Sequence, residues 1–244
     1  MLDQKVLQYN VPGFIADDPI SIPHRFIAKQ DIEIAGFLTA TISWGNRRSI
    51  VSNAQRLVGM MGGSPYDFLL HAKSEDFKPF LRFVHRTFNG NDCVFFLTSL
   101  KHIYSQYHSL EPLFGTMDER GAAHAISVFR EVFLSTAHLP RSEKHIADPL
   151  NGSAAKRINM FLRWMVRRDG CGVDFGIWES IDPAKLVCPL DLHVGRVARK
   201  LGLLHRHQND WKAAMELTVA LRELDPVDPV KYDFALFGTG VSSI

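Results

Sequence analysis

The spacing of apolar residues is the feature that most constrains the fold of this chain, because it follows a helical period almost throughout. Between residues 47 and 61, the apolar side chains recur at steps of three and four residues, which places them on one face of an α-helix. Gly62, Gly63 and Pro65 then end the pattern, since neither residue type continues a helix at low cost. No segment of any length alternates apolar and polar residues. The sequence therefore predicts an all-α protein.

Further segments with the same period predict helices along the rest of the chain. They span residues 31–43, 92–107, 121–137, 153–168, 191–203, 209–224 and 229–237. Asn209 is a candidate N-cap, and Gly202 and Gly238 are candidate helix ends. A polar break from Pro140 to Pro149 separates the first group of helices from the second.

Length and composition indicate which class of protein this chain belongs to. With 244 residues, 46% of them hydrophobic, the chain can bury a substantial core as one large domain or two small interleaved lobes. The apolar runs are shorter than a membrane-spanning helix needs, and residues 1–5 lack a signal pattern. We therefore expect a cytoplasmic protein that does not enter membranes. Three scattered cysteines, Cys93, Cys171 and Cys188, predict neither a disulfide framework nor a metal or iron–sulfur site.

The formal net charge is only +2, but the positive charges are unevenly distributed. Residues 156–168 and 192–208 contain cations and no acid. Such helices suit a surface that follows a phosphate backbone, although they are also compatible with ordinary solvated faces. The candidate nucleic-acid contacts are Arg157, Arg163, Arg196, Arg199 and Lys200, together with Gly152 and Ser153 in the preceding turn.

The most specific motif runs from Pro189 to Leu203, where Asp191 precedes a basic amphipathic helix. An Asp in this position is most often an N-cap that contributes about 1 kcal/mol. The complete Pro-Leu-Asp-Leu-His-Val string also resembles a segment of the helix-hairpin-helix DNA glycosylases, the superfamily of endonuclease III and 8-oxoguanine DNA glycosylase. That resemblance implies that Asp191 is catalytic.

A second element of the resemblance lies upstream, in residues 150–161, which look like a hairpin that ends in a lysine at the start of a helix. The separation between Lys156 and Asp191 is longer than in the endonuclease III branch and is more similar to the archaeal 8-oxoguanine branch. The hairpin keeps Gly152 but lacks the family's second glycine, so it departs from the usual phosphate-docking pattern. The chain also resembles a family of uncharacterised conserved bacterial proteins.

The resemblance implies a fold and a site. Residues 1–244 would form a single two-lobed domain, in which the N- and C-terminal helices make one lobe and residues from about 70 to 190 make the other. Lys156 and Asp191 would share the cleft. Residues 39–47 would place a helix end against an extruded nucleotide. The implied substrate-binding residues are Trp44, Asn46, Phe161 and His193.

The implied function is excision of a damaged base from double-stranded DNA, with an associated lyase step through a Schiff base on Lys156. We expect a monomer that uses no cofactor or iron–sulfur centre, since the four-cysteine loop of the endonuclease III branch is absent. One alternative is a nucleic-acid-binding protein with the same fold and no catalysis, in which Lys156 is an exposed first-turn residue and Trp44 belongs to the core. Another is a helical enzyme or scaffold that acts on something else. Asp233 lies in an apolar run, and if it is buried it needs a partner.

Overall fold

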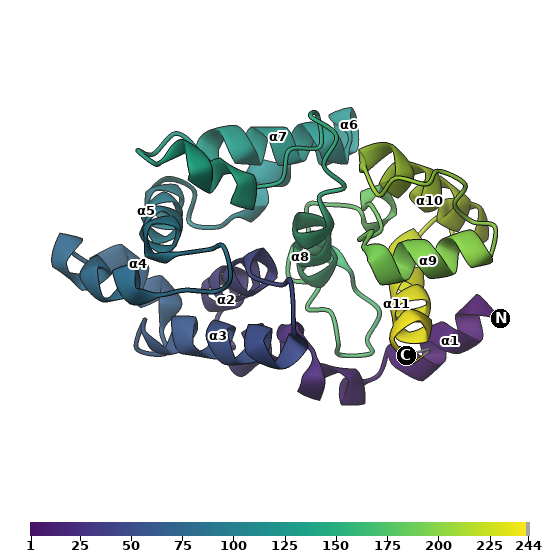
Figure 1. Ribbon diagram of the computed structural model, residues 1–244, viewed down its shortest axis with the longest axis horizontal. Helices are drawn as coiled ribbons and strands as arrows, with labels where there is room; N and C mark the ends of the chain where they lie inside the picture. Colours follow the sequence, from purple (N-terminus) through teal and green to yellow (C-terminus); the bar gives the residue numbers. More distant parts are fainter. Residues whose placement is uncertain (243–244) are drawn as a thin grey trace. The chain divides into compact units, whose positions relative to one another are not determined.

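The protein is all-α in the computed structural model, which describes residues 1–242 and their side chains except those at 118, 241 and 242. Within these residues there is no strand, only two isolated bridges, His85–Phe88 and Ser153–Asp210. The prediction of an all-α protein is confirmed. The helices (Figure 1) are α1 Leu2–Tyr9, α2 Lys29–Thr41, α3 Arg47–Gly59, α4 Pro65–His71, α5 Gly90–Tyr107, α6 Met117–Arg120, α7 Ala122–Phe133, α8 Lys156–Val166, α9 Leu192–Lys200, α10 Trp211–Leu224 and α11 Tyr232–Ser242.

Short 3₁₀ helices connect these elements. They are η1 Pro12–Asp17, η2 Pro19–Ser21, η3 Pro23–Arg25, η4 Ser74–Arg82, η5 Glu111–Phe114, η6 Pro140–His145, η7 Pro183–Lys185 and η8 Pro229–Lys231. Most of them begin at a proline, whose fixed φ suits a first helical position and whose missing N–H is not needed there.

The chain divides into two compact units. Unit 1 comprises residues 1–16, 115–127 and 147–244, and unit 2 comprises residues 17–114 and 128–146. Unit 1 therefore joins the two ends of the chain, whereas the sequence analysis placed the other lobe at about 70–190. The difference arises because α2 packs with α3 and α4 in unit 2, while residues 115–127 and 147–190 belong to unit 1.

Unit 2 is built around α2, whose residues from Ile32 to Thr41 are all buried. Phe37 on this helix packs among the rings of Phe96, Phe129 and Phe133, with centroid separations between 5.4 and 6.1 Å. Edge-on and tilted rings of this kind add to the burial of apolar surface that stabilises the core. α2 also carries a buried carboxylate, Glu33, which accepts hydrogen bonds from Tyr104, Ser109 and the Leu110 N–H.

Unit 1 has α11 at its centre, in contact with both α1 and α9 (Figure 1). The sequence analysis ended this helix at Gly238, but the helix continues to Ser242. Gly238 serves a packing purpose instead, because a Cβ built on it would lie 2.4 Å from ring atoms of Tyr9 on α1. The absent side chain lets the two helices approach closely.

Candidate functional site

The loop that precedes α8 determines the position of Lys156. Residues 148–152 form a tight turn, in which the Gly152 N–H donates to the Pro149 carbonyl and the Ser153 N–H donates to the Asp148 carbonyl, each at 3.0 Å. Gly152 has φ +89° and no atom within 4 Å of an added Cβ. The chain then passes through Ala155, a left-handed residue with φ +51°, and Lys156 begins the helix.

Asp191 determines the start of α9. Its Oδ1 accepts from the N–H groups of His193 at 2.8 Å and Val194 at 2.9 Å, so the expected N-cap is present. The other carboxylate oxygen, Oδ2, takes no part in this cap. The cap explains why the helix begins at Leu192, and it holds the carboxylate at a helix N-terminus, where the helix dipole stabilises negative charge.

The two helix starts bring Lys156 and Asp191 together. The Nζ atom of Lys156 lies 4.0 Å from Oδ2 of Asp191, and the two side chains are 28% and 22% exposed. An amine and a carboxylate that are separated by 34 intervening residues in the chain thus form one partly open pair within unit 1. A reactant that reached this pair would meet both groups at the same time.

One short segment, Asn209–Trp211, ties both helix starts together. The Asn209 side chain donates to the Asp191 carbonyl at 3.1 Å. The Trp211 N–H donates to the Gly152 carbonyl at 3.1 Å, and Asp210 forms an isolated bridge with Ser153. The sequence analysis took Asn209 as the cap of α10, but Asp210 is the cap, through its side chain to the Ala213 N–H. Asn209 instead connects the segment to Asp191.

Arg163 is buried beneath this site, and the prediction that it contacts nucleic acid is therefore wrong. Its side chain is 5% exposed and is paired with Asp174 at 3.2 Å and with Asp233 on α11. Its guanidinium carbon also lies 4.2 Å from the ring centre of Phe234. The arginine neutralises internal acids, which burial would otherwise make costly. The partner that the sequence analysis required for a buried Asp233 is Arg163.

Asp233 is a titratable group near the Lys156–Asp191 pair that sequence reasoning did not place in the site. Burial raises the pKa of its carboxyl to about 6, Arg163 and Lys156 oppose the rise, and the charge of Asp191 adds to it. Burial likewise raises the pKa of Cys188, with smaller contributions from Asp233 and Asp191. The only sequence signal for Asp233 was an acid inside an apolar run.

Phe161 also lies in the core rather than in a pocket. It is completely buried, and its ring packs edge-on against Trp178 with a centroid separation of 5.4 Å. The prediction that Phe161 binds substrate is therefore wrong, because its position on α8 faces the interior of unit 1. His193 is half-buried in the first turn of α9, where its main chain and Cβ lie close to Gly240 of α11.

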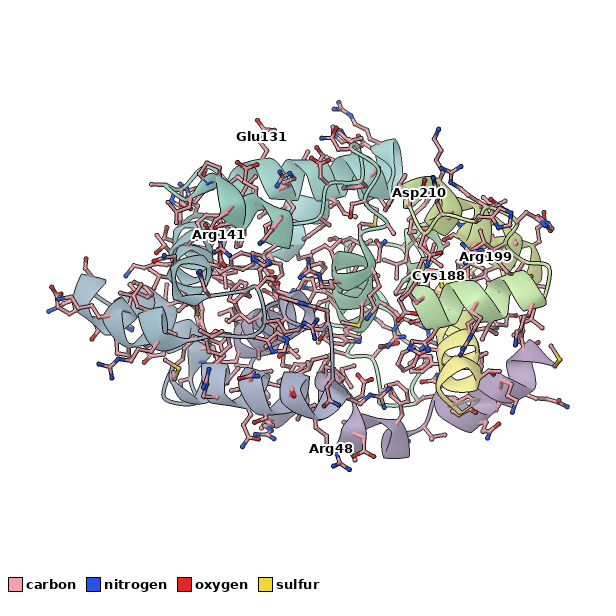
Figure 2. All side chains as sticks on the ribbon, in the orientation of Figure 1. Arg48, Glu131, Arg141, Cys188, Arg199 and Asp210 are labelled. Carbon is pink, nitrogen blue, oxygen red and sulfur yellow. The ribbon has the colours of Figure 1, made fainter. Side chains whose placement is uncertain are left out.

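The remaining predicted cations of unit 1 differ in how accessible they are. Arg196 and Lys200 are exposed on α9. Arg199 instead turns toward the segment before α10 and donates to the carbonyls of Arg206 and His207 as well as to the Asn209 side chain (Figure 2). Arg157 is half-buried, and desolvation lowers its pKa to about 10. Arg196 also donates to the Gly240 carbonyl of α11 at 2.9 Å, so Lys200 has the clearest access to a phosphate.

Trp44 and Asn46 belong to unit 2 and lie between α2 and α3. Asn46 is exposed and caps α3 by accepting from the Ser49 N–H at 3.2 Å. Trp44 is half-buried; its ring stacks on His145 at 5.8 Å and meets His85 edge-on at 5.0 Å. Trp44 is thus only partly a core residue.

Residues 1–242 show neither a metal-binding cluster nor a membrane-spanning helix. No group of three or more His, Cys, Asp or Glu side chains among these residues is arranged to hold a metal ion. In the same part of the chain, none of the helices combines the length and the apolar character needed to cross a bilayer.

Comparison with known proteins gives one match. A family model described as "Protein of unknown function (DUF2400)" matches residues 18–242, which is most of the chain. No curated protein and no solved structure matches the chain.

Proposed function

We propose that this chain, which belongs to the DUF2400 family, is a DNA base-excision glycosylase with an associated lyase step and a fold like that of the helix-hairpin-helix glycosylases. The observation that carries the proposal is the 4.0 Å approach of Lys156 Nζ to Asp191 Oδ2 at two helix starts. A resemblance in two separate motifs implied this pair, and the amine and the carboxylate do lie side by side within unit 1.

Asp191 would stabilise the charge that develops when a base leaves its sugar. Cleavage of the bond between the base and C1′ sends the bonding electrons to the base and leaves positive charge on the sugar ring. A carboxylate beside the ring stabilises that charge, most strongly where water is scarce. Because Oδ1 of Asp191 is fixed by the cap of α9, the carboxylate is held in one orientation before any substrate arrives.

Lys156 would supply the nucleophile. Its nitrogen, once neutral, forms a bond with C1′ as the base departs with the electron pair and a proton. Opening of the sugar ring then gives an imine between Lys156 and the former C1′. Loss of a proton from C2′ expels the 3′ phosphate and breaks the strand. The target nucleotide must first leave the stack, at a cost of a few kcal/mol.

The turn before Lys156 supports contact with DNA only in part. The N–H groups of Gly152 and Ser153 already donate within the turn, so they are not available to a phosphate. The exposed Ser153 hydroxyl is the remaining donor there. Lys200 on α9 is the cation best placed to follow the backbone, and the exposed Arg196 beside it would use the donors that its bond to the Gly240 carbonyl leaves.

Borohydride trapping tests the proposal. A duplex that contains an abasic site is incubated with the protein and borohydride, and a covalent adduct is expected with the natural chain. Lys156→Gln should abolish the adduct, whereas Lys185→Gln, which removes an exposed lysine from η7, should retain it. Absence of an adduct with the natural chain, or trapping that survives in Lys156→Gln, would contradict the proposed nucleophile.

A second candidate is a protein with the same fold that binds nucleic acid without catalysis. The cap favours it, because Asp191 has a structural use at α9 that requires no chemistry. This candidate predicts salt-dependent binding to DNA duplexes with no adduct and no base release from any damaged duplex. The trapping experiment therefore separates the two candidates directly.

A further inference from the structure

Two segments of unit 2 carry cations and no acid. Residues 34–66 and 77–91 contain neither Asp nor Glu. Their charged residues are Arg47, Arg48, Arg56, Lys78, Arg82 and Arg86. In a chain with 28 basic and 26 acidic residues overall, this is a marked local separation of charge. Neither segment overlaps the basic helices α8 and α9 of unit 1.

The structure places the two segments side by side. Arg56 on α3 donates to the Val84 carbonyl at 3.4 Å, and its guanidinium carbon lies 4.9 Å from the ring centre of Phe83. Asn53, one turn earlier on α3, lies 3.2 Å from Nδ1 of His85. The cations of α3 and of the turn at 82–88 therefore share one surface, which we call the α3–turn surface.

The cations of the α3–turn surface remain accessible to solvent. Arg48, Arg56, Arg82 and Arg86 are exposed, and Figure 2 shows Arg48 extending outward from the start of α3. These side chains can therefore meet a partner without rearrangement of the fold.

The acid on the first turn of α5, Asp92, does not neutralise the surface, and the exposed acids Glu75 and Asp76 lie at the other end of η4 from Arg82. The Asp92 side chain is completely buried. It pairs with Arg141 and accepts from Ser142, both of which belong to unit 2. The positive field of the α3–turn surface thus faces solvent.

A half-buried aromatic residue, Trp44, lies beside these cations. Nε2 of His85 lies 3.1 Å from the Trp44 carbonyl, and this hydrogen bond fixes the main chain at the start of the surface. Gly45, with φ +100°, follows, and an added Cβ there would lie 2.9 Å from the Arg86 guanidinium. Arg86 is itself left-handed at φ +54°. The turn thus holds a guanidinium against the residue that follows Trp44.

We propose that the α3–turn surface binds single-stranded nucleic acid, with phosphates on its arginines and an unpaired base on Trp44. Grooves that bind single strands combine cations with aromatic rings on which bases stack, and Arg48, Arg86 and Trp44 supply both features. An unpaired base is required, because a base inside a duplex does not expose its ring face. This binding would be separate from the chemistry of Lys156 and Asp191.

The buried apolar face of α3 argues against a membrane as the partner. Ile50, Ala54, Leu57 and Val58 are at most 6% exposed. Helices that lie on membranes instead expose their apolar face and bury it among the lipids. The polar face of α3 presents arginine, serine, asparagine and glutamine side chains to a partner.

Fluorescence anisotropy with a labelled oligothymidylate tests the proposal on the full chain. The probe has no lesion and no abasic site, so binding does not depend on the proposed glycosylase activity. Arg48→Glu/Arg82→Glu changes two exposed side chains. This double variant should weaken binding about tenfold or more. It should also reduce the slope of the logarithm of the binding constant against the logarithm of the salt concentration by about 1.4, because two phosphate contacts are lost. Lys73→Glu/Lys185→Glu makes the same change in net charge elsewhere and should leave the slope unchanged.

Trp44 variants test the stacking part. Trp44→Ala should weaken binding about tenfold, and Trp44→Phe should restore most of the loss, in variants whose thermal melts show that they are folded. Oligouridylate distinguishes RNA from DNA as the preferred strand. Equal loss in the two charge-reversal variants, or binding to phosphatidylserine vesicles with none to either oligonucleotide, would overturn the proposal.

Discussion

Asn209 connects Arg199 to Asp191. Its Oδ1 accepts from Nη2 of Arg199 at 2.7 Å, and its Nδ2 donates to the main-chain oxygen of Asp191 at 3.1 Å. Arg199 in turn donates to two carbonyls of the loop before α10. The start of α9 is therefore held by hydrogen bonds from the side chains of Asn209 and Arg199 as well as by its own cap. Networks of this kind position a functional carboxylate more tightly than a cap alone.

Asn209→Ala should weaken this support. The change removes two hydrogen bonds and leaves Arg199 with an unmet donor, so we expect a loss of about 1–3 kcal/mol in the free energy of unfolding. Urea denaturation measures it. Gln208→Ala, which alters an exposed neighbour that hydrogen-bonds only to Arg206, should cost less than about 0.5 kcal/mol. A similar loss in both variants would show that the Asn209 bonds contribute nothing specific.

Gly195→Ala should disturb the same contact from the side of α9. The added Cβ would lie 2.9 Å from Nη1 of Arg199 and from Oδ1 of Asn209, so these side chains must move. Although alanine is the better helix former, overpacking should destabilise the protein by about 1–3 kcal/mol. Gly59→Ala is the matched control, since no atom lies within 4 Å of its Cβ position at the end of α3. It should be neutral or slightly stabilising in thermal melts.

Substitutions at Asp191 can separate capping from chemistry. Asparagine caps helices about as well as aspartate, so Asp191→Asn should keep most of the stability, whereas Asp191→Ala should lose about 1 kcal/mol. Both variants lack the carboxylate that the proposed reaction needs, so both should lose base release from damaged duplexes. Thermal melts and a base-release assay on the same preparations measure the two properties. Full base release by Asp191→Asn would show that the Asp191 carboxylate does not stabilise the charge on the sugar.

The Asp233 carboxyl predicts a pH dependence of stability. Its folded pKa of about 6 lies above the ordinary value of 3.8, so the folded state holds this proton more tightly than the unfolded state. The contribution to stability is therefore complete below about pH 4 and is lost as pH rises through about 6. Relative to Asp233→Asn, the natural chain should lose up to ~3 kcal/mol between these limits, measured by urea denaturation. A constant difference across that range would contradict the raised pKa.

Periodicity predicted the longer helices of this chain, because helices such as α3 and α9 bury one apolar face and show it in the sequence, but it did not predict the short helices α1, α4 and α6. α3 and α9 begin at or within one residue of the expected positions. The ends were harder to predict, since glycine has more than one use. The sequence pattern predicted that Gly238 ends a helix. The glycine instead allows α11 to pack against the Tyr9 ring, and this contact could not be predicted before the packing of the helices was known.

The candidate site was predictable where a motif sits at a helix start, and less so where burial decides the role. The cap at Asp191 and the lysine at the start of α8 could both be read from local sequence. Phe161 and Arg163 lie about one and a half and two turns beyond Lys156 on α8, and every residue from Ile158 to Val166 is buried, which the apolar pattern of the helix does not show for an arginine. The acid partners of Arg163 come from other parts of the chain, so its burial becomes visible only after folding.

The pairing of α1 with α11 has a consequence for synthesis of the protein on the ribosome. Residues 17–114 and 128–146, which make up unit 2, all leave the ribosome before α11 is translated. At 5–20 residues per second, roughly, unit 2 has seconds in which to fold first. During that time α11 has not been synthesised, so Tyr9 and the other residues of α1 that contact α11 have no partner. Chaperones that guard nascent chains should therefore engage the emerging α1 for longer than any helix of unit 2.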